Sequence, residues 1–238
     1  MFMNDRPLGP PVPDWTPPDA PKPMTLSGRY CRLEPLEAEK HAALLFNAFE
    51  GQDYLYDYLP AGPFHSAAQY HRWVKEVTAD TSNLFFAVYD LRKNAYLGVL
   101  SYLRIAPKAG SIEVGNINFS QAMQRSPAST EAIYLTMQWA FDAGYRRFEW
   151  KCNALNAPSR RAAQRLGFSY EGTFRQALVV KGRNRDTAWF AMIDTEWPAL
   201  KEAYRVWLDP ANFDQDAQQR ERLGDLTGLV RVASDPSL

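Results

Sequence analysis

The chain has 238 residues, of which 46% are hydrophobic and 23% are charged, and its 27 basic residues balance its 27 acidic ones. A net charge of zero argues against a bulk electrostatic attraction to nucleic acid or to an anionic membrane. The sequence has no long uncharged apolar run and no signal-peptide pattern, and Cys31 and Cys152 are too few for a disulfide framework. These features favour a cytoplasmic protein with two buried thiols.

Residues 1–23 form an N-terminal arm in which prolines recur every few positions. Proline lacks a backbone N–H and fixes φ, so the arm is predicted to form neither a helix nor a central strand. It is either a disordered tail or an extended segment that Trp15 docks on the body. A single domain is predicted at residues 24–208, followed by a polar C-terminal tail at 209–238.

The first half of this domain is predicted to begin with a turn and a strand at 26–36. Apolar residues at helical spacing predict helices at 37–49 and 66–79. The segment between them, 53–59, is rich in aromatic and acidic side chains. A surface loop with its rings packed inward is the favoured interpretation of this segment. The alternative is a pocket lining whose carboxylates attract a cationic amine.

Three strands at 84–90, 96–105 and 111–119 are predicted to form an antiparallel meander. The third strand leads into a small-residue loop and then into a helix at 127–143, which is apolar nearly all round and should be buried. A helix N-terminus after such a loop suits an anion, because its first N–H groups lack internal partners. An ordinary polar helix cap is the alternative.

The rest of the domain is predicted to contain one more strand, a helix capped by Asn156, two final strands and a last helix. A short helix is expected in the tail, with frayed last residues. These elements are expected at 148–152, 156–166, 168–173, 184–194, 196–208 and, in the tail, 214–223.

The loop before the central helix, Gln124-Arg125-Ser126-Pro127-Ala128-Ser129, resembles motif A of the GNAT superfamily of N-acetyltransferases, Gln/Arg-x-x-Gly-x-Gly/Ala. The following Thr130-Glu131-Ala132 resembles the Thr-Glu-Ala of the ribosomal-protein serine/alanine N-acetyltransferase branch. Pro127 stands where the first Gly is expected and has no N–H to offer a phosphate. Arg125 can offset that loss with a charge-assisted contact.

Further signatures follow in the order that the family shows, and the resemblance covers about residues 26–208. Asn156-x-x-Ser159 and the later Leu166-Gly167-Phe168 resemble the family's Asn-x-x-(small) … Leu-Gly-Phe pattern. The resemblance implies an α+β chain with the GNAT (acyl-CoA N-acyltransferase) fold: a mixed, mostly antiparallel central sheet flanked by helices. It also implies transfer of an acetyl group from acetyl-CoA to a primary amine, on a protein N-terminus or a small molecule.

The family resemblance also assigns the residues that contact acetyl-CoA. Backbone groups near Asn118 and Phe119 are expected to face the thioester carbonyl and the pantetheine, which Asn156 also contacts. The pyrophosphate is expected to lie against the loop and the start of the central helix, at Gln124, Arg125, Ser126, Ala128, Ser129 and Thr130.

Catalysis of acetyl transfer to an amine needs a base for the amine proton and gains from an acid for the leaving thiolate. Glu113 is predicted as the base, with a hydrogen-bonded strand glutamate as the alternative, and Glu171 is a second candidate. Many family members have a tyrosine that acts as the general acid at the position of Ala163. Because this chain lacks that tyrosine, Ser159 is predicted to donate to the sulfur in its place. Its alternative is an ordinary first-turn serine. Direct attack by the amine is expected, because no cysteine occupies a nucleophile position.

No metal site is predicted, because the three histidines show no metal-ligand spacing. Arg160, Arg161 and Arg165 are expected either to contact the adenosine phosphates or to form a solvated helix face. The competing interpretation of the whole chain is a non-catalytic GNAT-fold module that senses acyl-CoA or recruits a partner. The sequence leaves both a monomer and a homodimer open.

Overall fold

The computed structural model describes residues 7–215 and 218–238, and these residues form one sheet in the order β1-β2-β3-β4-β5-β6-β8-β7. Neighbouring strands are antiparallel except for β5 and β6, which are parallel. The expected mixed, mostly antiparallel sheet is therefore confirmed. The strands are β1 (Leu26–Ser27), β2 (Cys31–Pro35), β3 (Leu84–Asp90), β4 (Ala95–Ala106), β5 (Ser111–Phe119), β6 (Arg147–Asn153), β7 (Ser169–Val180) and β8 (Arg183–Ile193).

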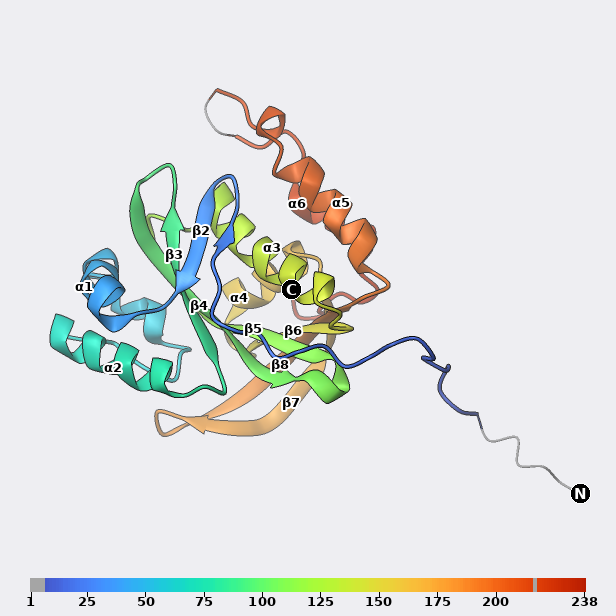
Figure 1. The fold of residues 1–238 in the computed structure, drawn as a ribbon, viewed down its shortest axis with the longest axis horizontal. Helices are drawn as coiled ribbons and strands as arrows, with labels where there is room; N and C mark the ends of the chain where they lie inside the picture. Colours follow the sequence, from blue (N-terminus) through green and yellow to red (C-terminus); the bar gives the residue numbers. More distant parts are fainter. Residues whose placement is uncertain (1–6, 216–217) are drawn as a thin grey trace, which may run out of the picture.

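Helices flank the sheet on both faces, as Figure 1 shows. The first two helices pack on β3 and β4 around Phe85, Ala87 and Val99. The larger core lies on the opposite face, beneath the central helix and those that follow it. The helices are α1 (Ala38–Ala48), α2 (Ala67–Ala79), α3 (Pro127–Asp142), α4 (Ala157–Arg165), α5 (Trp197–Trp207) and α6 (Leu223–Gly228), with short 3₁₀ helices at Asp53–Tyr56, Pro107–Ala109 and Pro210–Asn212.

Side-chain caps fix the starts of three of these helices. The Ser66 hydroxyl accepts a bond from Gln69 N at the start of α2, and Asn156 caps α4, as the sequence predicted. Helix α3 begins with a reciprocal capping box between Ser126 and Ser129. Each cap satisfies an N–H group that the helix itself leaves unbonded, which holds the helix start in place.

A buried glutamate on α3 ties this helix to the start of β2. The Glu131 carboxylate is 4% exposed and accepts bonds from three successive backbone N–H groups, those of Arg29, Tyr30 and Cys31, at 2.8, 2.6 and 2.8 Å. A Cβ on Gly28 would lie 2.3 Å from the Glu131 Cδ, so only glycine leaves room for the carboxylate. The contact fixes the central helix against the sheet that it covers.

The described part of the N-terminal arm is docked on the body rather than detached from it. Trp15 Nε1 donates to the Gly144 carbonyl at 3.0 Å, and the Arg146 guanidinium lies over the Trp15 ring. The Tyr145 hydroxyl donates to the Asp19 carbonyl. Trp15 therefore acts as the anchor that one of the two sequence interpretations required, while residues 1–6 lie outside the described residues.

The C-terminal tail contains a short helix, as expected, but at a different position. Its short helix is α6 rather than 214–223, of which residues 216–217 lie outside the described part. The tail is held against the body at Asp235, which is 3% exposed and forms a bidentate ion pair with Arg160 on α4, while residues 236–238 are exposed. Polar composition favours fraying, but the ion pair between a buried carboxylate and a buried guanidinium outweighs that tendency at Asp235.

Candidate active site

The parallel pair β5 and β6 separates halfway along its length. Pairing runs from Ser111 opposite Arg147 to Val114 opposite Trp150 and then stops. Beyond that point β5 pairs only with β4, and β6 only with β8. The two facing edges, 115–119 and 151–153, therefore carry backbone N–H and C=O groups that no neighbouring strand uses, and a ligand with amide groups can bond to them.

A bulge in β5 lies at this opening. Ser101 of β4 pairs with Gly115, but Val99 pairs with Asn118, so β5 contains one extra residue between the two pairs. Asn116 adopts a left-handed φ of 50° there. The extra residue reverses the alternation of side chains. Asn118 consequently lies beside Val99, on the face that α1 and α2 cover.

The loop after β5 returns to the end of that strand. Gln124 Nε2 donates to the Phe119 carbonyl at 2.9 Å, and Arg125 adopts a φ of 55° just before the helix cap. Within the described chain, no residue accepts a hydrogen bond from the backbone N–H of Arg125 or Ala128. These two N–H groups and the exposed Arg125 side chain can thus serve an anion at the start of α3.

Three side chains in the expected pyrophosphate cradle are already engaged inside the protein. The Ser126 and Ser129 hydroxyls form the capping box, and Thr130 Oγ1 accepts bonds from the Arg165 guanidinium at 3.2 and 3.3 Å. The Ala128 methyl group is buried in the core. Contacts from this segment to a phosphate would therefore come from the backbone and from Arg125.

Two of the three arginines on α4 neither point to a phosphate site nor form a solvated helix face, the two alternatives expected from the sequence. Arg160 is held by Asp235, and the Arg165 guanidinium lies over the Trp207 ring while bonding Thr130. Both charges are used inside the fold, so they form neither a phosphate site nor a solvated face. Arg161 is the exposed member of the three.

Ser159 lies beside the point where β5 and β6 separate. Its hydroxyl accepts a bond from Trp150 Nε1 at 3.1 Å, and Trp150 is the last β6 residue that pairs with β5. The Ser159 N–H donates to Asn156 Oδ1 at 3.1 Å, which fixes the first turn of α4. The hydroxyl also forms a hydrogen bond with the Cys152 side chain, so it has two partners inside the fold. Asn156 is a helix cap here.

Ala163, which occupies the position of the family's tyrosine, is part of the hydrophobic core. Ala163 is fully buried, and its methyl group packs in the large hydrophobic cluster. Cys152 is likewise a buried, unbridged thiol, as is Cys31. Burial raises the pKa of the Cys152 thiol, which keeps it protonated and unsuited to nucleophilic attack. The expected buried thiols are confirmed.

Glu113 is held in an ion-pair network across the sheet. Its carboxylate is 2% exposed and accepts two bonds from Arg104 at 2.8 Å, while Lys151 Nζ lies 3.0 Å away. Burial raises the pKa of the Glu113 carboxyl, and the two cations oppose that shift. Glu171 is exposed and paired with Arg147. Each candidate base therefore has its own cationic partner, and the base assignment stays a prediction.

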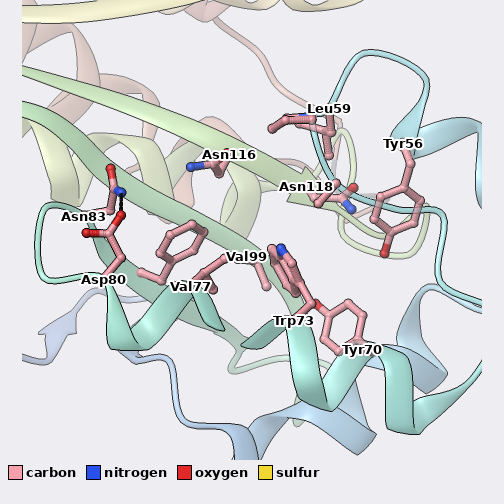
Figure 2. A pocket seen from close by; sticks show the side chains of 13 residues that line it. Tyr56, Leu59, Tyr70, Trp73, Val77, Asp80, Asn83, Val99, Asn116 and Asn118 are labelled. Atoms are coloured by element: carbon pink, nitrogen blue, oxygen red, sulfur yellow. Dashed lines mark hydrogen bonds between the residues drawn. The ribbon is translucent and has the colours of Figure 1, made fainter. Parts of the chain in front are cut away.

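A pocket of about 210 Å³ opens beside the bulged part of β5. Figure 2 shows Trp73 and Val77 of α2 on one side and Asn116 and Asn118 of β5 on the other. Tyr56 closes one end; burial raises the pKa of its phenol, which is therefore protonated at neutral pH. The segment 53–59 is thus a surface segment with Tyr56 packed inward, and it also contributes to the pocket lining.

The tip of the β7–β8 hairpin reaches the same side of the molecule. Lys181 Nζ donates to the Tyr56 carbonyl at 2.8 Å and contacts the Ala61 carbonyl at 3.3 Å. Three alternate β8 residues, Arg185, Thr187 and Trp189, each hold a buried polar atom for which the described residues offer no hydrogen-bond partner. None of these positions is predicted for the site from the sequence, because only the hairpin fold brings them to this side of the molecule.

Comparison with known proteins places this geometry in a family. A model of the acetyltransferase (GNAT) domain matches residues 31–169. A GCN5-related N-acetyltransferase structure from Brucella melitensis is 45% identical with a TM-score of 0.89, covering 91% of this chain and 100% of that chain. A structure from Chromobacterium violaceum ATCC 12472, described as a probable GNAT-family acetyltransferase, is 39% identical with a TM-score of 0.77, covering 83% and 100%.

A more distant neighbour is RimL, a ribosomal L7/L12 alpha-N-protein acetyltransferase. It is 20% identical with a TM-score of 0.62, covering 75% of this chain and 99% of that chain, a likeness that concerns the fold. A comparison with curated proteins found no match. The chain belongs to the GNAT acetyltransferase family and is an acyltransferase, as the sequence resemblance predicted.

The helices in the described part of the chain include none long and apolar enough to cross a membrane. Within residues 7–215 and 218–238, no three His, Cys, Asp or Glu side chains are grouped as a metal site requires. Members of this family use acetyl-CoA as a co-substrate, and the separated strands and the free N–H groups before α3 fit such a group.

Proposed function

We propose that this protein transfers the acetyl group of acetyl-CoA to a primary amine by direct attack of the amine on the thioester. The separation of β5 and β6 after Val114 and Trp150 is the observation that carries the proposal. Pantetheine contains two amide groups, and the exposed backbone edges of two diverging strands are suited to pair with them. The acyl end then lies close to the β5 bulge, beside the pocket.

The pyrophosphate is assigned to the N-terminus of α3. Support comes from the free backbone N–H groups of Arg125 and Ala128, from the exposed Arg125 side chain and from the helix dipole. Gln124 braces this loop by bonding to the Phe119 carbonyl. The missing N–H of Pro127 is thereby offset by a charge-assisted contact from Arg125.

Ser159 is assigned as the donor to the leaving sulfur. Its hydroxyl accepts a bond from Trp150 and also hydrogen-bonds the Cys152 side chain, so donation to the leaving sulfur requires the hydroxyl hydrogen to turn from Cys152 toward the strand opening. Glu113 is the proposed base, and the amine proton reaches its carboxylate through water. The carboxylate becomes accessible when Arg104 or Lys151, its two cationic partners, turns away. Donation to the thiolate and removal of the amine proton both occur at the end of the opened strands.

The acceptor is a primary amine on a protein N-terminus or on a small molecule. RimL acts on a protein, and the fold that it shares with this chain supports an acceptor site open enough for a peptide end. The pocket between α2 and β5 is the space assigned to the group that carries the amine.

Calorimetry with acetyl-CoA tests the proposed cofactor site. Replacing both Gln124 and Arg125 with alanine is expected to weaken binding about tenfold, since a charge-assisted bond to the phosphate is lost. The matched control is Arg205→Ala, which removes an exposed cation from α5 and should leave binding unchanged. Thiol release with a panel of amines then follows in the same samples. Failure of the unaltered protein to bind acetyl-CoA would contradict the proposal, and binding without thiol release would favour the sensor interpretation.

A further inference from the structure

The pocket beside β5 is lined mainly by rings and branched aliphatic side chains. Four aromatic residues come from three different elements: Tyr56 from the 3₁₀ segment, Tyr70 and Trp73 from α2, and Phe85 from β3. Tyr70 is 1% exposed and Phe85 is 7% exposed, so the walls are fixed by the second hydrophobic cluster. The cavity, about 210 Å³ in volume, therefore has an apolar wall that is already formed.

The pocket adjoins the place assigned to the thioester. Asn116 and Asn118, which line it, belong to the segment of β5 that has left β6. Asn116 is held by donating to the Ser101 hydroxyl at 2.9 Å. The Asn118 amide interacts with the Tyr56 hydroxyl. An amine placed at these two amides thus projects its substituent along α2, between Trp73 and Val99.

The charge of the lining limits what this substituent can be. Asp80 is the ionisable acid among the lining residues, and it lies at the end of the pocket opposite Tyr56, as Figure 2 shows. Its carboxylate accepts bonds from Ser82 N and Asn83 Nδ2, each at 2.9 Å. No lysine or arginine belongs to the described lining. An acidic substituent would therefore meet a like charge and no cation.

We infer that the acceptor of this enzyme carries a large apolar group, aromatic or branched aliphatic, next to its primary amine. The inference rests on the proposed function and names the substrate class for its site. A serine or glycine side chain would leave most of this apolar space unfilled. A phenylalanine or leucine side chain fills it and removes apolar surface from water, which is the dominant gain when a ligand enters such a site.

Both an N-terminal residue and a free amine can supply that chemistry. The test measures thiol release from acetyl-CoA with short peptides that begin with Phe, Leu, Ser or Glu, and with phenethylamine and ethylamine. Acceptors with the large apolar group are expected to exceed the small ones about tenfold or more in kcat/KM, as hydrophobic pockets commonly discriminate. Activity confined to the peptides or to the free amines identifies the source, and both results agree with the inference.

A variant that fills the pocket supplies the second arm. Val77→Phe places a ring in the space and is expected to reduce kcat/KM for the Phe and Leu peptides at least tenfold, while the Ser peptide changes less than threefold. The matched control is Glu76→Phe, which adds the same ring on the exposed face of α2. The KM for acetyl-CoA should stay unchanged in both variants, which separates pocket filling from general disruption of the site.

Three outcomes are distinguishable. Preference for Phe and Leu, lost in Val77→Phe alone, supports the inference. Preference for Ser or Glu, or equal loss in both variants, overturns it while leaving acetyl transfer intact. Absence of thiol release with every amine overturns the proposed function, and the inference falls with it.

Discussion

Replacing Ser159 with alanine is expected to lower kcat about 100-fold while changing the KM for acetyl-CoA less than twofold, in line with the usual contribution of a positioned proton donor. The reason is geometric. The Ser159 hydroxyl oxygen accepts a bond from Trp150, and the Ser159 N–H donates to Asn156. These two bonds fix the position of the hydroxyl that donates its hydrogen to the leaving sulfur. A thiolate leaving without that donor must be stabilised by water. Steady-state kinetics of thiol release, at saturating amine, measures the effect.

The control for Ser159 is another serine in the first turn of a helix. Ser129→Ala removes a hydroxyl from the first turn of α3, where it bonds only within the capping box and to the Ser126 carbonyl. It should reduce the free energy of unfolding by about 1 kcal/mol, because a capping bond is lost. It should leave kcat within threefold, because the proton donor is retained. Equal kcat in Ser159→Ala and the unaltered protein would remove Ser159 from the mechanism.

Glu131→Ala is expected to destabilise the fold by about 3–5 kcal/mol, since three buried N–H groups lose a charged acceptor at once. Those groups belong to Arg29, Tyr30 and Cys31 at the start of β2. Glu131→Gln keeps the shape of the side chain but only one acceptor oxygen. Its loss of unfolding free energy should be roughly half that of Glu131→Ala. Urea unfolding followed by tryptophan fluorescence gives both values.

An exposed glutamate provides the comparison for Glu131. Glu202 pairs with Arg205 on the surface of α5, and both side chains are largely exposed. Glu202→Ala should change stability by less than about 0.5 kcal/mol, since exposed ion pairs contribute little. A Glu131→Ala change as small as that of Glu202→Ala would show that the backbone groups of β2 find other partners.

Much of the fold is predictable because local signals agree with it. The apolar periodicity predicts α1 and α2, and Asn156 caps its helix as expected. Strands β3 and β5 have the predicted bounds. In these segments the residues that favour an element also bury its apolar face, so pattern and tertiary structure do not conflict.

The remaining features depend on contacts between distant segments. Glu131 is a motif residue in the sequence, and its carboxylate finds its three donors about 100 positions earlier in the chain. Asp235 lies in a polar tail, and only the fold places it opposite Arg160. Tyr56 enters the pocket because its segment turns inward against α2 and the hairpin tip bonds to it. Sequence spacing contains no signal for such pairings.

For the site itself, motif resemblance predicted the region but not the role of each side chain. The motif predicts Ser126 and Ser129 at the cofactor, but each hydroxyl accepts a bond from the backbone N–H of the other residue in a capping box. The bulge at Asn116 reverses the side-chain alternation of β5, which a period of two cannot anticipate. The pocket lining therefore emerged only with the strand register.

Amide hydrogen exchange with and without acetyl-CoA tests the central claim most directly, because the claim concerns backbone groups that the strands leave unpaired. Saturating acetyl-CoA is expected to slow exchange in segments 115–119 and 151–153 and at Arg125 and Ala128, with little change in α1 or α5. Protection confined to other segments, or none at all under conditions where calorimetry detects binding, would contradict a cofactor held between β5 and β6.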